Sequence, residues 1–129
     1  MDSSTLIAAL AGALGGIVFG AIWYSPALFG NAWRRLSRLP EDHAPNPAVT
    51  YGGAFALLFV AAAVFGAFLG PDPSLGFALG AGLSAGVTWA AGSLWISYLF
   101  EARPLRLGLI NGGYHTGQFV LYGLVFALL

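Results

Sequence analysis

Residues 105–129, LRLGLINGGYHTGQFVLYGLVFALL, form an apolar run that nevertheless carries several polar side chains. About 20 apolar residues in a helix cross the roughly 30 Å of hydrocarbon in a bilayer. The run is long enough to do so, and Arg106 is its only charged residue. The stretch therefore predicts a membrane-spanning helix that has a polar face.

Three further apolar runs of similar length precede it, at about residues 6–24, 48–69 and 75–100. Lipid cannot satisfy backbone polar groups, so runs of this length are expected to be helical. The first run follows Met1 and Asp2 without a basic segment, which favours a retained helix over a signal peptide. The sequence predicts a single all-α domain over residues 1–129, a polytopic membrane protein with four transmembrane helices.

The composition narrows the possible partners. Hydrophobic residues make up 58% of the chain and charged residues only 8%, whereas about a quarter of a soluble domain is charged. No basic stripe is present, so we expect no nucleic-acid partner. The chain has no cysteine, which excludes disulfides and thiolate metal sites. The expected partner is the lipid bilayer.

The arginines indicate how the helices are oriented. All five lie in or beside the first and third connections between the runs, at Arg34, Arg35, Arg38, Arg103 and Arg106. Cytoplasmic loops carry an excess of basic residues. The pattern therefore predicts that both connections are cytoplasmic and that both termini are outside.

A short helix is expected after the first run. Ser25 is suited to cap a helix and Pro26 to its first position. Apolar residues recur at helical spacing opposite three arginines, at Leu28, Phe29, Trp33 and Leu36. This pattern predicts a short in-plane helix in the cytoplasmic headgroup region. The alternative is that the first helix kinks at Pro26 and continues.

Small residues recur four apart in the first run, at Gly12, Gly16 and Gly20. Such spacing lets helix backbones approach closely. The glycines therefore serve either packing within the chain or a seam between two copies, and both interpretations stay open.

Four polar residues of the last run share one helical face. Asn111, His115, Gln118 and Tyr122 are spaced i, i+4, i+7 and i+11. His115 lies close to the middle of the run, where a polar group is most costly.

The third and fourth runs are joined by a short connection and should be antiparallel neighbours. Residues equally far from that connection should then lie at equal depth, which pairs Trp95 with Asn111, Ala91 or Gly92 with His115, Thr88 with Gln118, and Ser84 with Tyr122. These partners in the third run also share one face. The sequence therefore predicts a polar seam between the third and fourth helices.

The seam has two interpretations. In the first, the seam only joins the two helices by hydrogen bonds, because leaving buried amides unpaired costs about 1–3 kcal/mol. Alternatively, it lines a wet path in which His115 is a proton-linked switch. No carboxylate lies near that depth, so we expect a neutral imidazole.

Glu101 follows the third run, with Arg103 and Arg106 within reach. We expect a cytoplasmic ion pair that holds the hairpin together. No nucleophile and base arrangement, carboxylate pair or metal-ligand spacing is present. We therefore expect neither an enzyme nor a metal or cofactor site.

Three motifs resemble a known family. They are Ile22-Trp23-Tyr24-Ser25-Pro26-x-Leu28-Phe29-Gly30-x-x-Trp33, Tyr98-Leu99-Phe100-Glu101-x-Arg103, and Ile110-Asn111-x-Gly113-Tyr114-His115. Together they resemble the small bacterial membrane proteins classified as domain of unknown function 1761. The resemblance implies a four-helix protein of the bacterial inner (plasma) membrane and no particular activity.

Two functions fit these observations. The first is a small homo-oligomeric channel or transporter that moves a polar solute or ion along the polar seam. The second is a non-transporting structural or accessory protein whose basic helix binds anionic lipid or a partner protein.

Overall fold

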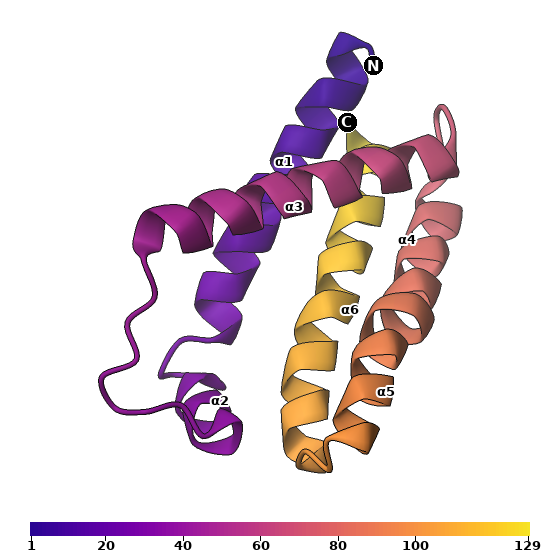
Figure 1. Cartoon of the computed structure of the whole chain (residues 1–129). Helices are drawn as coiled ribbons and strands as arrows, with labels where there is room; N and C mark the ends of the chain where they lie inside the picture. Colours follow the sequence, from indigo (N-terminus) through magenta and orange to yellow (C-terminus); the bar gives the residue numbers. More distant parts are fainter.

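The computed structural model describes residues 1–129 and is all-α, with five continuous helices and no strand (Figure 1). One of these is divided into α4, the π-helical segment η1 and α5. The bounds are α1 Ser3–Trp23, α2 Gly30–Ser37, α3 Pro47–Leu69, α4 Leu75–Ser84, η1 Ala85–Ala91, α5 Gly92–Phe100 and α6 Leu105–Leu128.

Side-chain caps begin three of the helices. Asp2 accepts a hydrogen bond from the Thr5 N–H at the start of α1, and Ser74 caps α4 in the same way. Asn46 caps α3 directly before Pro47, whose fixed φ suits the first helical turn. These bonds satisfy backbone donors that have no partner within the helix.

Three helices are long and apolar enough to cross a membrane: α1, α3 and the continuous helix Leu75–Phe100. Many large apolar side chains of the protein point outward. Leu57 is 73% exposed, Leu99 72% and Phe100 90%. Such a surface is typical of a chain that contacts lipid. α6 is equally long but less apolar, because polar residues and glycines interrupt it.

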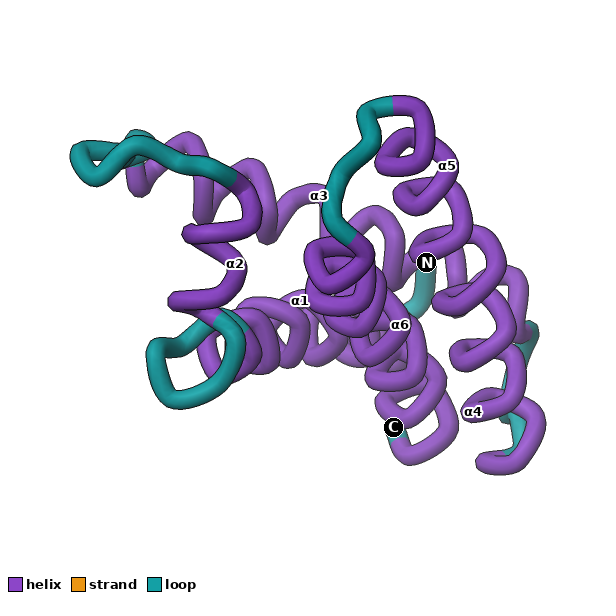
Figure 2. Tube along the Cα trace, turned by 90° about the horizontal axis from the view of Figure 1, so that it is seen from below, coloured by secondary structure: helices purple, strands orange, loops and turns teal.

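α6 is the central helix of the molecule. It contacts every other helix, and the views in Figures 1 and 2 show α1 and the α4–α5 helix on either side of it. α3 crosses α1 and α6 obliquely (Figure 1). The core where these helices meet includes Ala9, Ala13, Leu58, Ala62 and Tyr122. The two termini lie at the same end of the molecule (Figure 1).

The glycines of α1 face the interior of the chain. A Cβ on Gly12 would contact Tyr122 and Ala62, and one on Gly20 would contact Tyr114. Gly16 is buried against α3 in the same way. The face is thus used for packing within the chain, and a seam between two copies through these glycines is wrong.

The second helix forms, but its predicted start is wrong. α2 begins at Gly30, and Ser25 does not cap it because its hydroxyl donates to the Ile22 carbonyl oxygen at 2.7 Å. α1 ends at Trp23, so it does not continue through Pro26 either. The chain reverses tightly, and a Cβ on Gly30 would overlap the Tyr24 carbonyl oxygen. α2 lies at a steep angle to α1 (Figures 1 and 2).

Candidate functional site

The four predicted polar residues do share one face of α6, but this face does not follow the third predicted helix. We call Asn111, His115, Gln118 and Tyr122 the polar face of α6. Tyr122 donates to the Leu58 carbonyl oxygen of α3 at 3.0 Å, and its ring contacts Gly12 of α1. At Tyr122, the polar face therefore points at α1 and α3.

Glycines, not polar pairs, line the contact between α6 and the α4–η1 segment. A Cβ on Gly82 would overlap the Phe119 carbonyl oxygen, and one on Gly86 would lie 2.7 Å from the Cα of Thr116. Ser84 and Thr88 are exposed instead, and the Thr88 hydroxyl donates to the Ser84 carbonyl oxygen at 2.6 Å. The predicted polar seam between these helices is wrong.

The π-helical segment explains the error. The prediction assumed 3.6 residues per turn throughout, whereas a π-helix has wider turns and is rare. Trp95 lies against Gly108 and Gly112, close to its predicted partner, but at the far end Ala78 lies against Gly123. A longer stretch of the α4–η1–α5 helix thus runs beside a shorter stretch of α6. The wider turns shift the register and rotate the two hydroxyls outward.

Asn111 joins the end of α1 to α5. Its Oδ1 accepts a hydrogen bond of 2.6 Å from the Tyr24 hydroxyl, and its Nδ2 donates to the Tyr98 hydroxyl at 2.7 Å. Trp23 strengthens the same junction, because its indole N–H donates to the Ile110 carbonyl oxygen at 2.9 Å. Trp23 and Tyr24 of the motif that ends α1 thus attach this helix to α6, while Ser25 and Pro26 belong to the following turn.

The other three residues of the polar face form a chain of hydrogen bonds. His115 Nδ1 lies 2.8 Å from Gln118 Oε1, and Gln118 Nε2 donates to the Tyr122 hydroxyl at 2.7 Å. The Tyr122 hydroxyl in turn donates to the Leu58 carbonyl oxygen. Gln118 and Tyr122 are buried, with exposed fractions of 7% and 0%, and His115 is half-buried.

The direction of this chain determines the tautomer of His115. A carbonyl oxygen only accepts, so the Tyr122 hydroxyl must give its proton to Leu58 and accept from the Gln118 amide. The Gln118 oxygen then faces the imidazole and requires a donor there, which places the proton on Nδ1. In the neutral ring Nε2 is an acceptor, and no hydrogen bond within the chain uses it.

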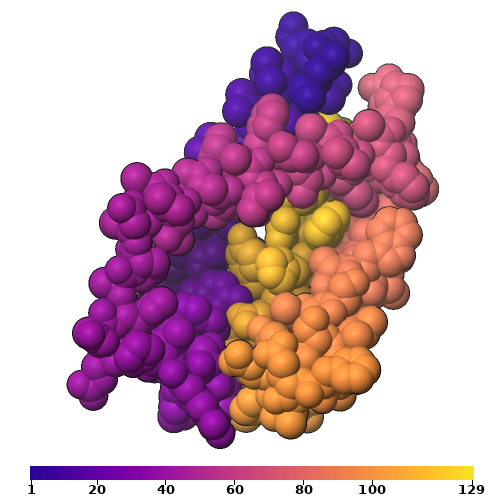
Figure 3. All heavy atoms as spheres, in the orientation of Figure 1, coloured from indigo at the N-terminus to yellow at the C-terminus, as the bar shows by residue number.

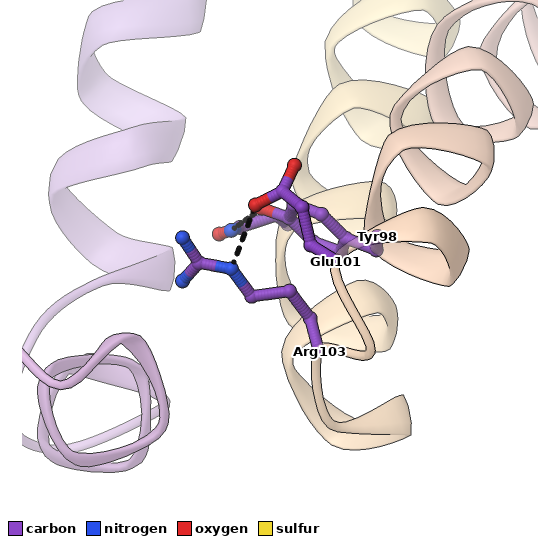
Figure 4. Close-up of polar contacts among 4 residues, drawn as sticks. Tyr98, Glu101 and Arg103 are labelled. Carbon is purple, nitrogen blue, oxygen red and sulfur yellow. Dashed lines mark hydrogen bonds and ion pairs between the residues drawn. The ribbon is translucent and has the colours of Figure 1, made fainter.

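The predicted ion pair is present in part. Arg103 Nε lies 3.0 Å from Glu101 Oε1 (Figure 4), and the guanidinium lies 5.9 Å from the centre of the Tyr98 ring. Arg106 makes no ion pair with Glu101, so that part of the prediction is wrong. Both paired side chains are more than a third exposed. The pair therefore contributes little to stability, and it lies within one turn instead of joining two helices.

Two tyrosines, Tyr98 and Tyr114, belong to the sequence motifs but were not predicted to be part of the polar site. Tyr98 hydrogen-bonds Asn111, and Tyr114 donates to the Gly16 carbonyl oxygen at 2.9 Å while its ring meets that of His115 edge to face. Tyr98 lies about one turn beyond Trp95, and that spacing could have identified it. No group of three His, Cys, Asp or Glu side chains comes together to hold a metal ion.

These features define a class of protein: an all-α chain in which three apolar helices of membrane-spanning length pack around a central helix with an inward polar face. The chain belongs to the family described as Protein of unknown function (DUF1761), which matches residues 7–127. The resemblance of the three motifs is thereby confirmed. No curated protein and no solved structure matches the chain.

Proposed function

We propose that the protein is a four-span integral membrane protein in which α6 is the fourth span. α6 has 24 residues, against 21 in α1 and 23 in α3, and it is the helix that all the others contact. Its polar residues bond within the chain, which lets a less apolar helix lie in hydrocarbon. We place the arginine-bearing end in the cytoplasm and both termini outside the bacterial inner membrane.

We further propose that the protein binds a small polar solute or ion at His115 and passes it across the membrane. The observation that supports this most directly is the open Nε2 acceptor of a half-buried imidazole near the middle of α6. Polar groups within membrane helices often mark substrate paths. In Figure 3 the yellow atoms of α6 are visible in a hollow below α3, which offers a route toward this helix.

A homo-oligomer is part of this proposal. The axis of a single copy is occupied by α6 itself, so a continuous path is expected to need a second copy. The path we propose follows α6 on the side of α1 and α3, and not the contact with the α4–η1 segment that the sequence favoured.

A second candidate function is a non-transporting structural or accessory role. Every buried polar side-chain atom has a hydrogen-bond partner in the chain, as expected if the polar face only joins helices. Under this alternative, His115 anchors the chain of bonds that ends at Leu58.

Flux into proteoliposomes separates the two functions. Purified protein is reconstituted, and entry of glycerol, urea and K⁺ is compared between wild type and His115→Ala, with His43→Ala in the connecting loop as the matched control. Transport predicts flux of at least one probe that His115→Ala abolishes and His43→Ala preserves. No flux with any protein, together with unchanged folding of all three, favours the accessory role.

A further inference from the structure

A small cavity lies where the two basic connections meet. It has a volume of about 370 Å³ and lies between the end of α2 and the turn that joins α5 to α6. Arg38 and Ser37 line it from one side, and Glu101 and Arg103 from the other. Two arginines from segments far apart in sequence thus share one cavity.

The cavity carries excess positive charge. Glu101 and Arg103 form the only ion pair of the chain, so Arg38 has no carboxylate partner. That pair uses Nε of Arg103, and Figure 4 shows its two terminal nitrogens pointing away from Glu101 toward the side where α2 lies. The planar fork of a guanidinium matches the oxygens of a phosphate. Two guanidinium groups therefore have free donors beside one cavity.

The surroundings favour a lipid over a free anion. Leu99, Phe100 and Leu105 flank the turn and are 72%, 90% and 63% exposed. If a phospholipid headgroup occupied the cavity, these three side chains would lie beside its acyl chains. On α2, Arg34 and Arg35 are exposed, whereas Trp33 is half-buried and its ring meets that of Tyr24 edge to face. Such a basic amphipathic helix with an aromatic anchor is typical of the membrane interface.

We propose that this cavity binds the phosphate of an anionic phospholipid, with Arg38 and Arg103 as its ligands and Phe100 beside the acyl chains. The proposal rests on the membrane topology proposed above. Bound lipid would hold α2 against the α5–α6 turn. No hydrogen bond or ion pair joins these two segments directly.

Lipid titration tests the proposal. The protein in a neutral detergent is titrated with phosphatidylglycerol, phosphatidylcholine or inorganic phosphate, and bound lipid is counted by native mass spectrometry. One phosphatidylglycerol should bind in preference to phosphatidylcholine, and inorganic phosphate should not displace it. Arg38→Gln should weaken this binding about ten-fold or more, as expected for hydrogen bonds to a charged group. Glu101→Gln should retain or tighten it, because a repelling carboxylate is removed.

Arg34→Gln is the matched control, since Arg34 is exposed in the last turn of α2, the helix that Arg38 caps, and does not line the cavity. It should act only through long-range attraction to the lipid phosphate, and this small effect should disappear as salt rises. Equal effects of Arg34→Gln and Arg38→Gln at high salt, or displacement of the lipid by inorganic phosphate, would overturn the proposal. Neither outcome alters the His115 flux result, so the two proposals fail separately.

Discussion

The hydroxyl of Tyr24 donates a hydrogen bond of 2.6 Å to Oδ1 of Asn111 and so joins the residue that caps the C-terminus of α1 to the first half of α6. Tyr98 accepts from the other side of the same amide. One polar residue of the central helix thus fixes the ends of two neighbouring helices. Because lipid removes the hydrophobic driving force between helices, hydrogen bonds of this kind help to hold them together.

Asn111→Ala is expected to destabilise the protein by about 1–3 kcal/mol, because it removes two hydrogen bonds and leaves two phenols without a partner. Asn31→Ala, on the exposed side of α2, is the control and should have almost no effect. Unfolding by SDS in mixed micelles measures both. In the Asn111→Ala background, Tyr98→Phe should then cost nothing further; a full additional loss would show that the two residues are not coupled.

The sequence predicted the helices well and the contacts between them poorly. Length and hydropathy were enough for the helices, since membrane spans must be long, apolar and helical. The shared polar face of α6 was also correct, because it depends only on regular α-helical spacing. The partners of that face were wrong, since they depend on the π-helical segment Ala85–Ala91, which has no simple signal in the sequence.

The turn after α1 shows a second limit of the same kind. Ser25 and Pro26 have the residue types of a helix start, but they lie in a tight reversal instead. The reversal brings the backbone of Gly30, where α2 begins, close to the Tyr24 carbonyl oxygen. Local propensity cannot reveal such a reversal, because it is stabilised by the packing of Trp23 and Tyr24 on α6.

Gly82→Ala is expected to destabilise the contact between α4 and α6 by about 1–3 kcal/mol, the usual range for overpacking. The added methyl group would meet the Phe119 backbone, which cannot rotate away as a side chain could. Gly80→Ala is the matched control on the same helix, since nothing lies within 4 Å of that Cβ position. It should be neutral or slightly stabilising, because alanine is the better helix former. Thermal unfolding in detergent compares the pair, and equal melting temperatures would contradict the close contact.

The proton of neutral His115 is expected on Nδ1, because the Gln118 oxygen must accept it. ¹⁵N chemical shifts of the two ring nitrogens in histidine-labelled protein report its position, with His43 in the loop as an internal comparison. Gln118→Leu removes the acceptor, so the Nδ1 preference of His115 should be lost while the His43 signals stay unchanged. A proton on Nε2 in the wild type would contradict this assignment, because the Gln118 amide would then be flipped and the Tyr122 hydroxyl would donate to Gln118 instead of to Leu58.

Cysteine labelling tests whether α6 crosses the membrane. The chain has no cysteine, so each single substitution introduces the only reactive thiol. Glu41→Cys and Leu105→Cys should react with a membrane-impermeant maleimide in inverted vesicles but not in intact cells, because arginine-rich ends stay in the cytoplasm. Ser4→Cys and Leu129→Cys should show the opposite pattern. If Leu129→Cys and Leu105→Cys label from the same side, α6 does not span the bilayer and only the three more apolar helices do. If all four patterns are reversed, α6 still spans, but the arginine-bearing end lies outside and the lipid cavity faces the opposite leaflet.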